Sequence, residues 1–296
     1  MDEMKGNSMA VFNSNDIYPV SADSELPFEQ HRDIFHLTGI DQEETILLLY
    51  PPSKDDKTRE ILFIRKSDNH TKVWEGEKLS KKQANELSGI DSIYFIDDFK
   101  DILSSIATKV DTFYINKNEH YRANSPVETR EDRFISWLLK KYPAHNVAKS
   151  NPILQRQRSI KHPDEIDQIK KACDITRKGF NRVLEFIKPN VWEYEIEAEF
   201  IHEFINSSSK GFAYSPIIAS GNDNNVLHYI KNNKQCKSGE LILMDVGAEY
   251  GNYSSDMTRT VPVSGKYSKR QKEIYNAVLR VKNCLLYTSD AADELL

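Results

Sequence analysis

The chain has 296 residues, with 40 Lys or Arg, 45 Asp or Glu and a formal net charge of −5. This charge argues against a nucleic-acid or anionic-membrane binder, since such proteins carry a basic excess or patch. At roughly 150 residues per domain the length predicts two domains. A content of 39% hydrophobic and 29% charged residues excludes an intrinsically disordered chain.

The sequence offers no membrane or secretory signal. No apolar run approaches the ~20 residues needed to cross a bilayer, and the charged start MDEMKGNSM lacks the apolar segment of a signal peptide. The three cysteines, Cys173, Cys236 and Cys284, are odd in number and far apart. They are typical of reduced thiols rather than of disulfides or a zinc site. We therefore expect a cytoplasmic protein.

Residues 1–150 alternate strand-like and helix-like patterns, and we interpret them as a compact α/β domain. Short apolar runs bounded by turn residues predict strands at 45–50, 60–65, 92–96 and 112–116. Apolar positions at helical spacing predict helices at 81–89, 99–109 and 129–143. Residues 144–162 are polar, basic and weakly periodic, so we interpret them as the linker to a second domain.

Residues 151–285 are predicted to form an α+β domain, because two helices are followed by a run of strands and another helix. Pro163 opens the first helix, and apolar residues from Ile166 to Ile187 recur every three or four positions. The second helix is predicted over 192–206, although its alternating start also fits a strand. Strands are predicted at 216–220, 226–230, 241–248 and 253–263. Ser268 and Gln271 form a capping box that begins the last helix.

The final segment, LYTSDAADELL (286–296), differs from the helix before it. Thr288, Ser289 and Asp290 interrupt the apolar stripe, and the segment resembles translated sequencing-adapter tails. We interpret 286–296 as a non-native tail, with the natural reading frame lost near Leu285. The alternative is an ordinary polar C-terminal tail.

The most informative segment is LILMDVGAEYGNYSSDMTRT (241–260), which contains two aspartates eleven residues apart. Asp245 follows four apolar residues, and Asp256 follows the turn-forming EYGN. If the turn is centred between Tyr250 and Gly251, the two aspartates lie directly opposite each other on paired strands. Carboxylates in that position repel each other, so a proton, a cationic side chain or a metal must offset the repulsion.

Three interpretations of this pair compete on spacing alone. The aspartates could be solvent-facing turn residues, since Asp is a common turn former. They could share a proton or pair with Arg259. They could also hold hard cations, and two bridging carboxylates can hold two metals about 3.5–4 Å apart, an arrangement that activates water for hydrolysis. His228 lies in the strand-like VLHYI before the hairpin, where a lone histidine is either structural or functional.

Taken together and in this order, the segments resemble aminopeptidase P, the Xaa-Pro aminopeptidases among the pita-bread metallopeptidases. The similar segments are PVSADSELPFEQHRDIFHLTGI (19–40), KVWEGEKLS (72–80), RSIKHPDEIDQIKKACDIT (158–176), SGNDNNVLHY (220–229) and MDVGAEYGNYSSDMTRTVPVSGK (244–266). Prolidases, methionine aminopeptidases and creatinases share the spacing of the two aspartates, whereas the N-terminal segments point to aminopeptidase P. The resemblance implies an α/β N-terminal domain of the creatinase and aminopeptidase P kind, followed by the first half of an α+β pita-bread catalytic domain.

The resemblance also implies an activity, namely hydrolysis that releases the N-terminal residue of a peptide with proline at position 2. It implies two divalent cations, usually Mn²⁺, with Asp256 bridging both and Asp245 binding one. His228 would hydrogen-bond the substrate or the tetrahedral intermediate. Trp74 matches a tryptophan that approaches an active site within a homo-oligomer, a dimer or tetramer; the alternative is core or interface packing.

The family completes its site with a further histidine and two glutamates, and here the sequence departs from it. After Asp256 the chain has no His, and its later acids are Glu273, Asp290, Asp293 and Glu294. Two aspartates cannot fill the ~6 positions that each hard cation needs. We therefore expect a fragment that lacks the later ligands, binds no stable metal pair and is inactive alone.

The same resemblance predicts an unstable second domain. Pita-bread domains consist of two related halves, so a single half would expose a sheet edge and an apolar face. Two rival functions remain, a non-catalytic pita-bread homologue that binds peptides or proteins and a prolidase-type dipeptidase. The joint presence of Asp245, Asp256 and His228 argues against the first rival, and the reading frame beyond residue 285 would separate the alternatives.

Overall fold

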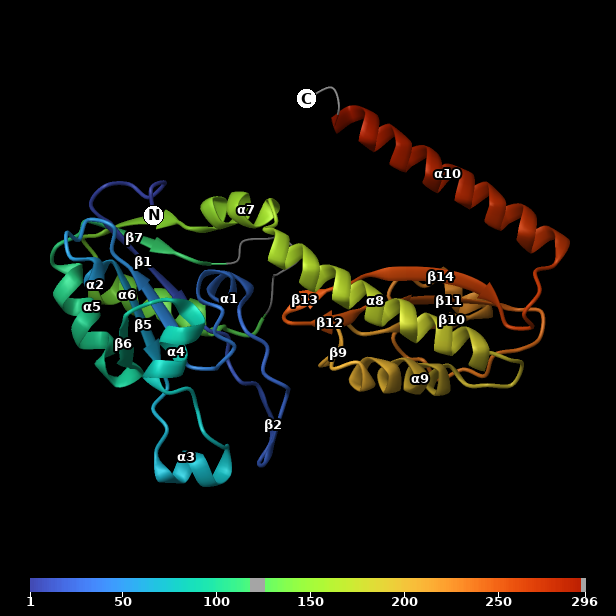
Figure 1. The fold of residues 1–296 in the computed structure, drawn as a ribbon, viewed down its shortest axis with the longest axis horizontal. Coiled ribbons are helices and arrows are strands. Elements are labelled where there is room, and N and C mark those ends of the chain that lie inside the picture. Colours follow the sequence, from blue (N-terminus) through green and yellow to red (C-terminus); the bar gives the residue numbers. More distant parts are fainter. Residues whose placement is uncertain (118–125, 294–296) are drawn as a thin grey trace. The chain divides into compact units, whose positions relative to one another are not determined.

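The computed structural model describes residues 1–117 and 126–293, and the chain divides into two compact units after Lys161 (Figure 1). The first unit therefore extends beyond the expected limit at residue 150. The interpretation of 144–162 as a linker is wrong, because this segment forms β8 (Asn146–Lys149) and α7 (Asn151–Ser159) of the first unit. Leu154 of α7 is buried in the core of that unit, which explains why the segment is ordered.

The first unit is built on a mixed sheet with the strand order β6-β5-β4-β1-β7-β8. Its other strands are β1 (Ser8–Asn13), β4 (Ile46–Leu49), β5 (Glu60–Ile64), β6 (Ser92–Phe95) and β7 (Thr112–Ile115). The four strands expected from the sequence are confirmed. The predictions omitted β1, which lies inside the sheet and is buried along its whole length.

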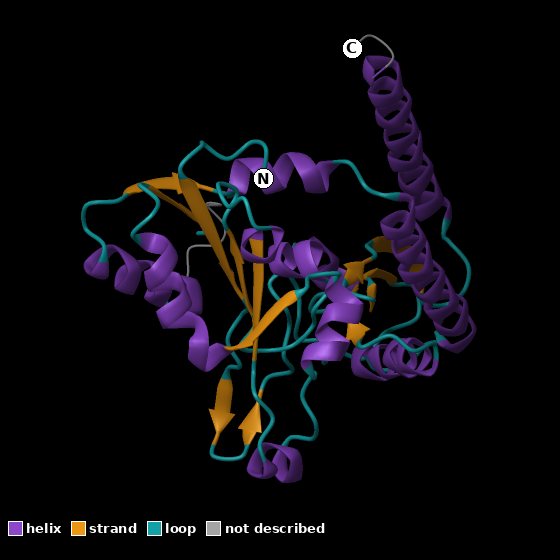
Figure 2. Ribbon diagram, turned by 60° about the vertical axis from the view of Figure 1, so that its left-hand side comes forward, coloured by secondary structure: helices purple, strands orange, loops and turns teal. Residues whose placement is uncertain are grey.

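Helices cover both faces of this sheet (Figure 2). The helices of the first unit are α1 (Arg32–Thr38), α2 (Asp56–Arg59), α3 (Asn69–Trp74), α4 (Lys81–Ser88), α5 (Phe99–Ala107) and α6 (Arg130–Lys141), with the 3₁₀ turn η1 (Ile96–Asp98). Side chains of α5 and α6 pack on one face, where Leu103 and Leu138 are buried. Side chains of α1, α4 and α7 pack on the other, where Ile34 and Ala84 are buried.

Two short features project from the first unit on the same side, the hairpin of β2 (Pro19–Ser21) and β3 (Ser24–Glu25), and helix α3 (Figures 1 and 2). Both expose apolar side chains: Val20 is 62% exposed and Val73 is 80% exposed. These features contribute little to the core, so their sequences are not explained by packing within the unit.

The part of the second unit that the structure describes contains three α-helices and short antiparallel sheets, as expected for an α+β domain. Its elements are α8 (Pro163–Phe186), α9 (Glu193–Asn206), β9 (Gly211–Phe212), β10 (Ile217–Ser220), η3 (Gly221–Asn225), β11 (Leu241–Val246), β12 (Ala248–Tyr250), β13 (Tyr253–Ser254), β14 (Met257–Pro262) and α10 (Lys269–Asp293). The helix expected over 192–206 is confirmed. The core lies between α8 and α9 and one face of the strands, with Phe180, Phe200 and Met244 at its centre.

One further expectation for this unit is wrong, because residues 226–230 form an irregular loop rather than a strand. Although Thr288 interrupts the apolar stripe, helix α10 continues to Asp293. The Thr288 hydroxyl donates to the Cys284 carbonyl at 2.5 Å, a back-bond that lets a polar residue remain in a helix. Residues 294–296 of the expected tail lie outside the described residues. Within the described ranges, no helix combines the length and apolarity needed to span a bilayer.

Candidate active site at the aspartate hairpin

The hairpin that contains the two aspartates turns at Gly251 and Asn252. Tyr250 pairs with Tyr253, so these two residues flank the turn. Gly251 has φ 58° and Asn252 has φ 67°. Positive φ at both central residues defines the two-residue turn that fits the twist of a hairpin. The turn therefore lies one residue later than predicted, because Gly and Asn tolerate this backbone and Tyr250 does not.

The shifted turn changes how the aspartates face each other. Asp245 lies opposite Thr258, and Asp256 lies in the gap between β13 and β14. The expectation that the two residues are directly opposite is therefore wrong. The structure nevertheless brings their carboxylates together around the Tyr214 hydroxyl. This hydroxyl contacts Asp245 Oδ1 at 2.7 Å and Asp256 Oδ1 at 3.1 Å.

Gly247 makes this close arrangement possible. A Cβ at this position would lie 1.8 Å from the Ser255 carbonyl oxygen and 3.1 Å from Cε1 of Tyr214. The Gly247 carbonyl also accepts a hydrogen bond of 2.8 Å from Ala213 N, which places Tyr214 next to the hairpin. Any larger residue would force apart the segments that carry Tyr214 and Asp256.

Two buried hydroxyls hold the hairpin onto α8. Thr176 Oγ1 and Ser255 Oγ are 2.7 Å apart, and both accept from Ala248 N, at 2.9 and 3.0 Å. Ser255 directly precedes Asp256, so this pair fixes the backbone from which Asp256 extends. Thr176 was read from the sequence only as part of an apolar helical stripe.

The two carboxylates lie on the sheet face away from the main core. Ile242 and Met244 face that core, so Asp245 faces the opposite side together with Leu243. Asp245, which follows the apolar run, is half-buried, and Asp256 is exposed. The Tyr214 hydroxyl between them and the exposure of Asp256 to solvent reduce the repulsion between the two charges.

The phenol itself responds to this environment. Burial raises the pKa of Tyr214 above its ordinary value of 10.0, and the hydrogen bonds and charges of Asp245 and Asp256 raise it further. The hydroxyl therefore stays protonated and acts as a donor at neutral pH. Arg259, considered from the sequence as an ion-pair partner, instead donates to the Thr258 carbonyl at 2.8 Å.

The remaining sequence-predicted residues lie in different settings. His228 is exposed on the loop between η3 and β11. Trp74 ends α3 in the first unit, is 76% exposed and stacks on His70 with ring centroids 6.0 Å apart. Core packing, the alternative considered for Trp74, is therefore wrong. Tyr214 was missed because the sequence FAYSP carries no periodic or motif signal.

The donor atoms around the two aspartates determine whether a metal pair could bind here. Across 1–117 and 126–293, no group of three or more His, Cys, Asp and Glu side chains lies close enough to hold an ion. Asp245 and Asp256 supply hard oxygen donors on one face, but a pair of hard cations needs several more ligands. The residues present therefore fit part of a dinuclear site and do not complete one.

Comparison with known proteins agrees with both units. The model for "Aminopeptidase P, N-terminal domain" matches residues 1–114, and that for "Metallopeptidase family M24" matches residues 167–288. The chain therefore resembles aminopeptidase P in both units, with the N-terminal domain followed by an M24 domain. The M24 match includes Tyr214, Asp245 and Asp256, so the hairpin site lies within the segment that resembles the peptidase domain.

Individual relatives show the same resemblance. The chain is 30% identical to the Xaa-Pro aminopeptidase of Escherichia coli (strain K12) over 94% of its own length, and 30% identical to Xaa-Pro aminopeptidase 3 of Homo sapiens over 92%. It spans 63% and 54% of the lengths of these relatives.

Solved structures confirm the fold class, an aminopeptidase P N-terminal domain with part of a pita-bread domain. One from Bacillus anthracis, named as an aminopeptidase P, superposes with a TM-score of 0.88 at 31% identity, covering 94% of this chain and 66% of that one. An Escherichia coli aminopeptidase P in complex with substrate gives 0.83 at 30% identity, covering 94% and 63%.

Proposed function

We propose that this chain represents the N-terminal domain and the first part of the catalytic domain of a Xaa-Pro aminopeptidase, a hydrolase that releases the residue before proline. The observation that carries the proposal is the convergence of Asp245 and Asp256 on one hydroxyl, within a domain of metallopeptidase family M24. The names of the relatives support the substrate class, peptides with proline at position 2.

The proposal assigns a role to each site residue. Asp245 and Asp256 are the first two ligands of a pair of divalent cations, for which Mn²⁺ is the proposed identity. Because the described residues do not complete the ligand set, we propose that the chain by itself is a fragment that binds no stable metal pair and does not turn over peptide. His228 contacts bound peptide, and its exposure supports that role.

We further propose that Trp74 binds substrate at the site of a neighbouring copy in a dimer or tetramer. Its support is that α3 projects from the first unit and leaves the indole 76% exposed (Figure 1). The three cysteines form no disulfide, which is consistent with the proposed cytoplasmic location.

Titration of the chain with Mn²⁺, followed by electron paramagnetic resonance of the free ion, tests the ligand assignment. We expect weak binding, with a dissociation constant of about 10⁻⁴ M or higher, because two carboxylates alone coordinate the ion. Asp245→Asn and Asp256→Asn should each abolish it. Asp174→Asn is the matched control, because Asp174 is a partly exposed aspartate that pairs with Arg177 on α8, away from the hairpin.

The outcomes are distinct. Tight binding of two Mn²⁺ per chain, or hydrolysis of a tripeptide with proline at position 2, would overturn the proposal that the chain alone is inactive. Weak binding that survives both Asn substitutions would overturn the assignment of the aspartates as ligands. That result, together with binding of the tripeptide without hydrolysis, would favour the non-catalytic peptide-binding alternative.

A further inference from the structure

A buried carboxylate outside the aspartate hairpin has no part in the proposed chemistry. Glu193 is the first residue of α9, and none of its surface is exposed. Its Oε1 accepts from Ser220 N at 2.8 Å and from Ser220 Oγ at 2.7 Å. Its Oε2 accepts from Tyr229 Oη at 2.8 Å and from Lys234 N at 3.0 Å. A buried carboxylate is costly unless its oxygens are paired, and here four donors satisfy them.

These four bonds hold one segment at both ends. Ser220 directly precedes η3, and Lys234 lies at the end of the loop that follows η3. The two ends of segment 221–234 are therefore both bound to Glu193. Backbone contacts reinforce the closure. Glu193 N donates to the Lys234 carbonyl at 2.9 Å, and Lys234 Nζ donates to the Ser220 carbonyl at 3.1 Å. Asn232 of the same loop donates to Glu197 Oε2 at 2.9 Å.

The loop has little packing of its own. Val226 is 51% exposed, Leu227 is 84% exposed and Ile230 is 61% exposed, and His228 is exposed between them. Tyr229 and Asn232 are the buried exceptions. The Tyr229 ring packs against Ile217, Ala219 and Leu243 while its hydroxyl reaches Glu193. Burial, together with the hydrogen bond to Glu193, raises the pKa of Tyr229 to about 12, so the phenol remains a donor at neutral pH.

We infer that Glu193 is the positioning residue for His228. Through Ser220 it holds the backbone that precedes His228, and through Tyr229 and Lys234 it holds the backbone that follows, so that the exposed imidazole extends from an ordered loop. The inference rests on the proposed function only for the role given to His228. The anchoring is a property of this chain and can be measured without metal or peptide.

Glu193→Gln tests the inference because Gln has the same shape but presents an NH₂ group on one side. Each carboxylate oxygen accepts a backbone N–H, one from Ser220 and one from Lys234. Neither orientation of the Gln amide can therefore satisfy both. We expect amide hydrogen exchange over 226–234 to accelerate by about tenfold or more. The His228 ring signal in ¹H–¹³C NMR, assigned with His228→Gln, should shift or broaden.

Glu195→Gln is the matched control. Glu195 lies on the same helix, and its side chain accepts from Trp192 N at 2.7 Å, a bond that Gln can also make. This variant should leave the His228 signal unchanged. Should Glu193→Gln not fold, Tyr229→Phe removes one donor, keeps the other three and should still shift the signal.

Unchanged loop exchange and an unchanged His228 signal in a folded Glu193→Gln variant would overturn the inference. With Tyr229→Phe as the only folded variant, an unchanged signal would do the same. Loss of Mn²⁺ binding bears on the proposed function alone, so the two proposals fail separately.

Discussion

At the residue scale, the Tyr214 hydroxyl is the contact that joins the two aspartates. Tyr214→Phe removes the hydroxyl and keeps the ring. We expect the free energy of unfolding at neutral pH to fall by about 1 kcal/mol, because two carboxylates lose a shared donor. In an Asp245→Asn background the loss should be smaller, since a charged acceptor forms the stronger hydrogen bond. Urea unfolding of wild type, Tyr214→Phe, Asp245→Asn and the double variant measures the loss of unfolding free energy in both backgrounds.

Tyr267→Phe is the control for this cycle. Tyr267 Oη donates to the Thr260 carbonyl at 2.7 Å, a neutral acceptor, so its removal should cost the same in both backgrounds. A Tyr214→Phe effect that is equal with Asp245 and with Asn at that position would show that the hydroxyl is not coupled to the carboxylate.

The sequence predicted part of this site for a clear physical reason. An Asp after four apolar residues, followed by a turn and a second Asp, singled out Asp245 and Asp256, but spacing alone left three interpretations open. Their role as metal ligands was implied by the resemblance and stays a prediction. The register of the hairpin depends on which two residues adopt positive φ in the turn, and these are Gly251 and Asn252. Tyr214 could not be predicted, because only tertiary folding brings it beside a strand that begins at Leu241.

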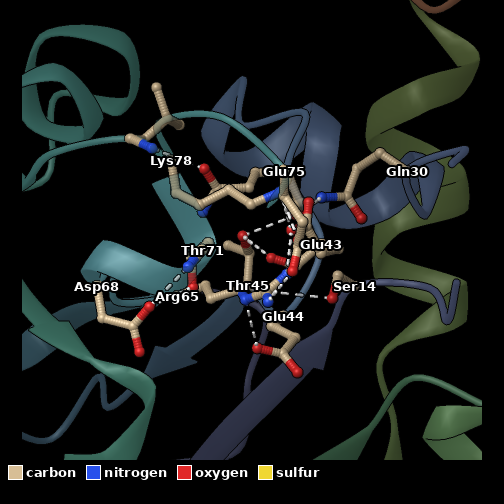
Figure 3. A network of polar contacts seen from close by, with 12 residues as sticks. Ser14, Gln30, Glu43, Glu44, Thr45, Arg65, Asp68, Thr71, Glu75 and Lys78 are labelled. Atoms are coloured by element: carbon tan, nitrogen blue, oxygen red, sulfur yellow. Dashed lines mark hydrogen bonds and ion pairs between the residues drawn. The ribbon is translucent and has the colours of Figure 1, made fainter. Parts of the chain in front are cut away.

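At the element scale, a charged cluster holds the base of the projecting helix α3 (Figure 3). Arg65 forms a two-bond pair with Glu75 at 2.6 and 2.7 Å and also contacts Glu43 at 2.9 Å. Lys78 Nζ lies 2.7 Å from Glu43 and 3.1 Å from Glu75. Glu75 directly follows Trp74, so the ion pairs of Glu75 fix the backbone from which the exposed indole extends.

Arg65→Met should loosen this helix and destabilise the first unit. The substitution leaves Glu43, whose side chain is only 10% exposed, without its arginine partner. We expect a loss of about 1–3 kcal/mol in the free energy of unfolding, with faster amide exchange over 69–75. Lys72→Met is the control, because Lys72 pairs with Glu77 in an exposed ion pair that should contribute at most about 1 kcal/mol. Equal losses in the two variants would contradict the prediction.

The same cluster predicts a pH dependence. The hydrogen bond from Arg65 holds the pKa of Glu75 below its ordinary value of 4.5. A carboxyl whose folded pKa is lowered contributes stability above its unfolded pKa and loses it as pH falls through the folded value. The stability difference between wild type and Arg65→Met should therefore be constant at neutral pH and shrink below about pH 4.5.

Elements were predicted from sequence where their periodicity is strong. The helices α8 and α9 bury six and four residues, α6 buries Ile135 and Leu138, and all three were predicted from their patterns. Helix α7 buries only Leu154, so its helical pattern was too weak to distinguish from a linker. Residues 226–230 have strand-like composition, but Glu193 on a distant helix binds Tyr229 and holds the segment as a loop. Contacts with residues distant in sequence therefore determine the conformation of both α7 and segment 226–230.

At the scale of the whole molecule, the chain spans about two thirds or less of the relatives it matches, and its last helix has an apolar face in solvent. Ile274, Val278, Val281 and Leu285 follow one another at spacings of four, three and four along α10. Their exposed fractions are 49%, 63%, 59% and 63%. Such a stripe is typical of a helix that packs against a partner.

We expect this face to drive self-association of the chain. Light scattering after size-exclusion chromatography should show a mass that rises with protein concentration, and Val278→Lys with Leu285→Lys should return the chain to a monomer. Asn276→Lys with Asn283→Lys is the matched control, since it adds the same charge at the same spacing on the opposite face of the helix. A wild-type chain that stays monomeric at all concentrations would contradict the prediction. If both double variants dissolve the assemblies equally, net charge rather than the apolar stripe controls association.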